Sequence, residues 1–155
     1  MGASAWEYVV PHQPDLSAAL EALRQQVFAA GEYVKPSGSG WDLPEPASVE
    51  DLFAEQQYWE FMGSCGTHTV IDIFNGVIAA DDFGVEEFGT VRSLSADDCV
   101  ELFGVAQPSR ADYQPLAGSA RLYDYVTGGR WTGRAAVLWA SGAPAEILFW
   151  GFSGD

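Results

Sequence analysis

Positive charge is scarce in this chain. Only 7 Lys and Arg residues stand against 22 Asp and Glu residues in a chain of 155, which gives a formal net charge of −15. Direct binding to DNA, RNA or an anionic membrane is therefore disfavoured, because those surfaces attract a positive patch. A basic partner is favoured instead, and electrostatic steering would speed its approach. The same charge also keeps a protein soluble whatever it binds.

Long apolar runs and a leader segment are also lacking. No stretch approaches the length of a membrane span. The first residues have neither the basic region nor the apolar region of a signal peptide. These features predict a cytoplasmic protein, and the two cysteines, Cys65 and Cys99, are then expected to be reduced thiols.

Apolar residues, by contrast, are plentiful. The chain is 48% hydrophobic and 14% aromatic, so it can bury enough apolar surface to offset the entropy lost on ordering. Residues 1–155 are predicted to form a single globular domain. The six Trp, six Tyr and nine Phe residues exceed the needs of a minimal core, and some of these rings are expected at a contact surface.

Local patterns predict an alternation of strands and helices. Asp15 precedes apolar residues at helical spacing and Gly31 follows them, which is typical of a capped helix. Asn75-Gly76 is a strong hairpin signal. Further strands are predicted at residues 6–10, 69–74, 77–80 and 90–92, and further helices at 48–59, 95–103 and 119–126.

The end of the chain predicts the centre of a sheet. Residues 133–140 and 145–152 are apolar at odd and even positions alike, with turn residues at 141–144 between them. Such strands belong where both faces of a sheet are covered. The whole pattern predicts an α+β fold, in which a mostly antiparallel sheet has the C-terminal hairpin at its centre and helices packed on it.

Three segments carry a resemblance to a known family. They are the strand and helix of residues 6–33, the sequence Gly66-Thr67-His68-Thr69-Val70-Ile71-Asp72, and the ending Ile147-Leu148-Phe149-Trp150-Gly151-Phe152-Ser153-Gly154-Asp155. Together they resemble a family of small acidic bacterial proteins, of actinobacterial type, that has no assigned activity. The resemblance implies that the three segments belong to one domain, and it carries over no catalytic or binding residue.

Cys65 and His68 are the sharpest candidates for catalysis. A bend at Gly66 could bring the thiol to the imidazole, as in a thiol-dependent hydrolase. On a strand, Asp72 would lie about 13 Å from His68, so a third catalytic group would have to come from elsewhere in the fold. The alternative is a buried structural cysteine beside a hydrogen-bonded histidine.

Metal and cofactor motifs are incomplete. Cys65 and His68 have no second pair of ligands at zinc-site spacing. The glycines at 63 and 66 lack the lysine and spacing of a phosphate-binding loop. No metal or cofactor is predicted.

Carboxylates and rings are interleaved after the predicted hairpin. The candidate partner-binding residues are Asp81, Asp82, Phe83, Glu86, Glu87 and Phe88, with Trp41 and Trp131 at the rim. Carboxylates can pair with arginine, and rings supply apolar anchors. The alternatives are that these carboxylates form a solvated loop and that Trp41 folds back onto the core.

The leading hypothesis is a binding protein that neutralises a basic protein partner. An immunity protein that inhibits a toxin domain or another nucleic-acid-binding enzyme fits this description. The alternative is a small enzyme that uses Cys65 and His68. A third hypothesis is a weak homodimer, in place of a monomer, formed by pairing of residues 6–10.

Overall fold

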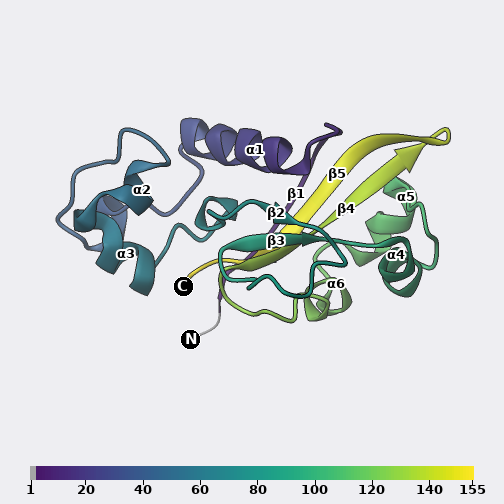
Figure 1. Ribbon diagram of the computed structural model, residues 1–155. Helices are drawn as coiled ribbons and strands as arrows, with labels where there is room; N and C mark the ends of the chain where they lie inside the picture. The colour runs from purple at the N-terminus through teal and green to yellow at the C-terminus, as the bar shows by residue number, and fades with distance from the viewer. Residues whose placement is uncertain (1–2) are drawn as a thin grey trace.

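The computed structural model describes residues 3–155 (Figure 1). The strands are β1 (Ala5–Pro11), β2 (Val77–Ile78), β3 (Thr90–Ser93), β4 (Thr132–Ala140) and β5 (Ala143–Phe152). The five strands of the described chain fall into three groups, β1, β2–β3 and β4–β5, which are separated by two groups of helices. The α-helices are α1 (Leu16–Ala30), α2 (Asp51–Ala54), α3 (Trp59–Ser64), α4 (Ala96–Phe103), α5 (Arg110–Tyr113) and α6 (Ala120–Asp124). Short 3₁₀ turns lie at Ser37–Ser39, Gln56–Tyr58, Val70–Asp72 and Gln114–Leu116.

The five strands form one sheet in the order β1-β5-β4-β3-β2. The two longest pairings, β1 with β5 and β4 with β5, are antiparallel, while the short strands β2 and β3 add parallel pairings on the far side of β4. The predicted α+β fold with the C-terminal hairpin inside the sheet is confirmed. The strand predicted at residues 6–10 is also confirmed, and it lies at one edge of the sheet as β1.

Both faces of the central hairpin are covered, as its sequence predicts. Ile147 and Phe149 pack in one apolar cluster with α1 and α3, whereas Leu148 and Trp150 pack in a second cluster with α4, α5 and α6. The alternation follows from the period of two along a strand. Figure 1 shows α1 on one side of the sheet and the α4–α6 group on the other, with α2 and α3 in a separate lobe at one end.

The ends of several helices follow their sequence signals. The Asp15 side chain accepts a hydrogen bond from the amide of Ala18, and Gly31 ends α1 in the left-handed conformation. Ser95 and Asp98 form a reciprocal capping box at the start of α4. Cys99 and Leu102 are the buried residues of α4, while Val100 points outward and is 49% exposed.

The helix predicted at 48–59 is interrupted. Ser48 and Asp51 do bond each other's backbone amides, but the backbone becomes extended at Glu55 (φ −91°, ψ 123°). The chain therefore forms α2, a 3₁₀ turn and α3 in succession. Two short helices and their turn place Leu52, Tyr58 and Phe61 in the core together.

The strand predicted at 69–74 is wrong. This segment forms the 3₁₀ turn Val70–Asp72, and His68 before it has a positive φ of 60°. The cause is Asp72, which is fully buried and accepts hydrogen bonds from the amide and hydroxyl of Thr67 and from the amide of Gly154. A buried carboxylate must find such donors, and this demand overrides the apolar pattern around it.

The hairpin predicted at Asn75-Gly76 is also wrong. The segment after it, β2, pairs parallel with β3, and the element directly before it is the 3₁₀ turn Val70–Asp72, not a strand. Asn75 instead binds the carbonyl of Phe88 through its side chain, and the Gly76 carbonyl accepts from the amide of Val91. Within residues 3–155, no helix is long and apolar enough to cross a membrane.

Candidate functional site

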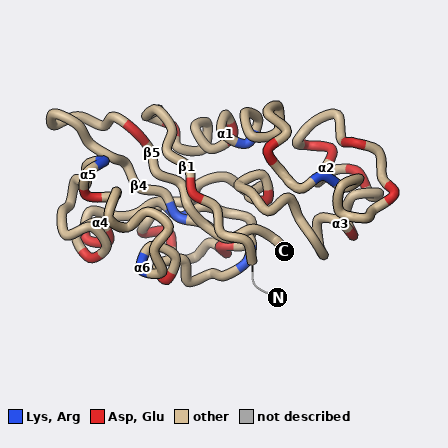
Figure 2. Tube along the Cα trace, turned by 180° about the vertical axis from the view of Figure 1, so that it is seen from behind, with Lys and Arg blue, Asp and Glu red and all other residues tan. Residues whose placement is uncertain are grey.

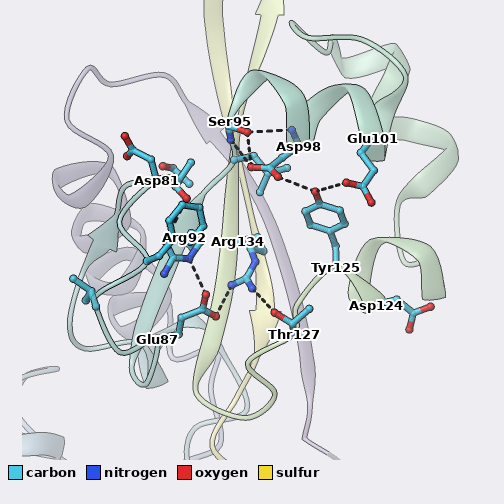
Figure 3. A pocket seen from close by; sticks show the side chains of 15 residues that line it. Asp81, Glu87, Arg92, Ser95, Asp98, Glu101, Asp124, Tyr125, Thr127 and Arg134 are labelled. Carbon is cyan, nitrogen blue, oxygen red and sulfur yellow. Dashed lines mark hydrogen bonds and ion pairs between the residues drawn. The ribbon is translucent and has the colours of Figure 1, made fainter.

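The main cavity of the protein is a groove of about 850 Å³. The loop 79–88, which follows β2, forms one wall, and α4 together with the segment after α6 forms the other (Figure 3). Strands β3 and β4 form its floor. Five carboxylates and two guanidinium groups line it: Asp81, Glu87, Asp98, Glu101, Asp124, Arg92 and Arg134. We call this cavity the acidic groove.

The floor of the acidic groove holds two guanidinium groups around one carboxylate. Arg92 and Arg134 are register partners on β3 and β4, and Glu87 bridges them, with one carboxylate oxygen 2.7 Å from Arg92 Nε and the other 3.1 Å from Arg134 Nη1. Burial raises the pKa of Glu87, but the hydrogen bonds and charges of the two arginines outweigh it and hold that pKa below its ordinary value. Glu87 is therefore an internal anion shared by two buried or half-buried cations, and the three groups together carry a net charge of +1.

The α4 wall contains a second set of internal bonds. Asp98 accepts from Ser95 in the capping box, and the Tyr125 hydroxyl donates to Asp98 at 3.0 Å. The same hydroxyl lies 3.4 Å from Glu101. Burial and then the neighbouring Asp98 raise the pKa of Tyr125, so its hydroxyl stays a donor. Burial also raises the pKa of Asp98, but the bonds from Ser95 and Tyr125 hold it below its ordinary value.

Three carboxylates remain at the two rims. Asp81 on the loop wall and Asp124 on the opposite wall are exposed and form no ion pair within residues 3–155. Glu101 is also exposed, and within residues 3–155 its carboxylate has only the long contact to Tyr125. Figure 3 shows Asp81 on one side of the groove and Glu101 and Asp124 on the other. A cation between the walls would meet carboxylates from both sides.

An exposed ring stands beside these carboxylates. Phe83 is 86% exposed, and its ring lies 5.9 Å from the Arg92 guanidinium carbon. Val85, on the same loop, is exposed as well. Large apolar side chains left in water next to a cavity are typical of contact residues.

The structure places the predicted partner-binding residues in three groups. Asp81, Phe83 and Glu87 line the acidic groove, while Asp82 and Glu86 are exposed on the same loop outside the lining. The other three residues are rings outside the groove.

Phe88 and Trp131 form a separate ring cluster with Phe74. The ring centres of Phe88 and Trp131 lie 5.7 Å apart, and that of Phe74 lies 5.6 Å from Phe88 and 6.0 Å from Trp131. Trp41 belongs neither to the groove lining nor to this ring cluster, because it is half-buried and packs edge-on against Phe61 in the core. The structure therefore does not bring Trp41 to the groove.

Sequence reasoning missed most of the opposite wall and the floor. The missed residues are Arg92, Asp98, Glu101, Asp124, Tyr125 and Arg134. One signal was available: Arg134 interrupts a long apolar strand, and a buried guanidinium requires a carboxylate partner. Nothing local marked Asp124 and Tyr125, because they reach the groove only through the long connection between β3 and β4.

A second cluster of reactive side chains lies where the two ends of the described chain meet. The Cys65 sulfur is 3.8 Å from His68 Nε2, and His68 Nδ1 is 3.1 Å from the Ser4 hydroxyl. Ser4 in turn donates to Asp155 at 2.8 Å, and Asp155 lies 3.7 Å from His68 Nε2. We call these four residues the thiol corner. Asp155 approaches the same ring nitrogen that faces Cys65, whereas a third catalytic group would bond the other nitrogen, Nδ1, which contacts Ser4.

The electrostatics of the thiol corner oppose a thiolate. Burial raises the pKa of Cys65; a hydrogen bond from Ser39 lowers it, but the charges of Asp155 and Asp72 raise it again, and the net shift is upward. An activated cysteine needs the reverse, a positive neighbour or a helix N-terminus. Cys99 is buried too, and its pKa is raised to about 11.

Comparison with known proteins adds no further constraint on the site. No family model, curated protein or solved structure matches the chain. Within residues 3–155, no three His, Cys, Asp or Glu side chains are grouped so that they could hold a metal ion.

Proposed function

We propose that this protein is an acidic binding protein that neutralises a basic protein partner. The partner's cationic surface enters the acidic groove, and the loop 79–88 is the principal contact segment. In this proposal the protein is an immunity-type inhibitor that acts in the cytoplasm against a toxin domain or another nucleic-acid-binding enzyme.

One observation carries the proposal: unpaired carboxylates stand on both walls of the groove next to a ring that is 86% exposed. Glu87 and Asp98 together match the charges of Arg92 and Arg134, so the negative charge of the three rim carboxylates is available to a ligand. Carboxylates at a rim pair with Arg or Lys, and the ring adds an apolar anchor that becomes desolvated on binding.

The overall charge favours a protein partner over nucleic acid. A net charge of −15 repels phosphate backbones and attracts basic proteins over about one Debye length. Figure 2 shows Asp and Glu near α4 and α6 and also around α2 and α3, so acidic side chains occur at both ends of the molecule. The groove carboxylates line a cavity of about 850 Å³, whereas exposed carboxylates such as Glu32, Asp42 and Glu60 lie outside it.

That difference defines the experiment. Variant Asp81→Lys/Glu101→Lys/Asp124→Lys reverses the three rim carboxylates. Variant Glu32→Lys/Asp42→Lys/Glu60→Lys reverses three exposed carboxylates outside the groove and has the same net charge. A basic protein is first captured from native cells on the wild-type protein at low salt and eluted with rising salt, and each variant is then titrated with it.

The proposal predicts that the groove variant loses about a hundredfold in affinity, while the control loses less than about tenfold. Equal losses in the two variants would mean that only net charge matters, and the groove assignment would be abandoned. Recovery of no basic protein would remove the proposed function itself.

The 3.8 Å contact between Cys65 and His68 keeps a thiol enzyme as the second candidate. The raised pKa of Cys65 weighs against it, and Cys65 does not line the main cavity.

A further inference from the structure

The loop 79–88 contains no helix or strand, yet it carries Asp81 and Phe83 to the groove rim. Its own backbone supplies few bonds between loop residues, among them those from Asp82 to the Ala79 carbonyl and from Phe83 to the Asp81 carbonyl. A segment with so few internal bonds needs an outside support to keep one shape.

Arg92 provides that support from β3. Its Nη1 atom donates to the carbonyls of Ala79 and Asp82, at 2.9 Å each, and lies 3.4 Å from that of Ala80. Its Nε atom donates to Glu87 at 2.7 Å. One guanidinium group thus contacts both ends of the loop, and the Phe83 ring lies beside it.

The chemistry of arginine suits this task. A guanidinium group is planar, always charged and has five donors in a fixed fork, so it can hold several oxygens in a set arrangement. A lysine has the same charge but a single flexible ammonium, which fixes fewer acceptors in space. Arg134 holds the second oxygen of Glu87 and so anchors the far end of the same support.

We infer that Arg92 is a positioning residue that shapes the loop 79–88 and thereby sets how strongly the loop binds a basic partner. The claim about binding strength rests on the proposed function. The claim about loop shape does not, because it concerns the free protein. A loop held in its bound form loses less entropy on association, and preorganisation of this kind raises affinity.

The sign of the effect separates positioning from charge. Arg92→Gln makes the protein more negative, so charge alone predicts tighter binding to a basic partner. Positioning predicts weaker binding. Arg110→Gln is the matched control, because Arg110 is exposed, pairs with Glu146 and does not line the groove.

Loop shape is measured by limited digestion of the free protein with chymotrypsin, with the cut after Phe83 identified by mass spectrometry. Cleavage requires the loop to leave its folded shape, and its rate reports local opening. We expect Arg92→Gln to be cut about tenfold faster than wild type, Arg92→Lys to fall between them, and Arg110→Gln to match wild type within about twofold. Denaturant unfolding of each variant shows whether it is folded. If Arg92→Gln does not fold, Arg92→Lys takes its place in the digestion experiment.

The two possible failures are distinguishable. Unchanged cleavage at Phe83 in both Arg92 variants would overturn the inference and leave the proposed function intact. Faster cleavage combined with unchanged or tighter binding of the captured basic protein would show that loop shape does not govern binding. That outcome would overturn the second half of the inference and also remove the loop from the proposed site.

Discussion

The acidic groove and the thiol corner both bring ionisable side chains into contact, but their surroundings differ. In the groove, two guanidinium groups pair with Glu87, and the rim carboxylates Asp81 and Asp124 form no ion pair within residues 3–155. In the thiol corner, the charges that act on the Cys65 thiol are those of Asp155 and Asp72. The groove therefore has charge to offer a ligand, while the corner has a cysteine held in its protonated form.

The difference teaches that proximity alone does not make a reactive site. The Cys65 sulfur lies 3.8 Å from His68 Nε2, and Ser4 and Asp155 also contact this imidazole. Burial and negative charge still raise the pKa of the thiol, and the thiolate is the form that reacts. The hydrogen bonds in this corner hold the two ends of the described chain together, which is a structural role.

The largest effect is expected from Asp72→Ala, beside the thiol corner. Removing this carboxylate leaves the amide and hydroxyl of Thr67 and the amide of Gly154 without their acceptor in a buried position. The unfolding free energy, measured in denaturant, should fall by roughly 3 kcal/mol. Asp81→Ala at the groove rim is the control and should change it by less than about 0.5 kcal/mol. An unchanged unfolding free energy in Asp72→Ala would show that the hydrogen bonds of Asp72 do not stabilise the fold.

A smaller and pH-dependent effect is expected from Glu87→Gln in the groove. Its carboxylate bonds two arginines, one of them buried, so its loss should cost about 2 kcal/mol of unfolding free energy at pH 7. The pKa of Glu87 is below its ordinary value in the folded protein. The stabilisation is thus complete above the unfolded-state pKa and is lost as pH falls through the lower, folded-state pKa.

The two unfolding curves should therefore converge in acid. The comparison is made by denaturant unfolding of wild type and Glu87→Gln from pH 7 down to about pH 3. A difference that stays constant over this range would contradict the ion-pair account of the groove floor.

The smallest effect is expected at Cys65 itself. Because burial and the nearby carboxylates raise the pKa of this thiol, alkylation by iodoacetamide at pH 7 should be no faster than that of a free cysteine, and its rate should rise with pH through the alkaline range. Cys99→Ser removes the other thiol, so the signal reports Cys65 alone. Fast alkylation with a midpoint below pH 7 would show that Cys65 is an activated thiol, and the thiol corner would then be the candidate catalytic site.

The parts of the fold that the sequence predicted depend on local or repeated signals. The caps at Asp15 and Ser95 bond residues three positions away, and the two-sided apolar pattern of β4 and β5 reflects their place inside the sheet. The segment at 69–74 was mispredicted because one buried carboxylate, Asp72, takes donors from Thr67 and from distant Gly154. No local pattern encodes a partner 82 residues away.

The candidate site divides in the same way. Asp81, Phe83 and Glu87 lie in one short acidic and aromatic segment, and composition was enough to find them. Asp124 and Tyr125 face that segment only because β3 and β4 pair in parallel across a long connection. Trp41 carried the same composition signal as Phe83 but packs on Phe61, since ring burial depends on the fold around it.

The salt dependence of association tests the groove most directly. The association rate constant of the captured basic protein is measured by stopped flow between about 0.05 and 0.5 M NaCl. For the wild-type protein and for the Glu32/Asp42/Glu60 variant, the rate constant should fall steeply with salt. For the Asp81/Glu101/Asp124 variant it should be slower at low salt and nearly independent of salt. If the association rate constants of all three proteins fell equally steeply with salt, the account would be contradicted, because the groove carboxylates would then guide no partner.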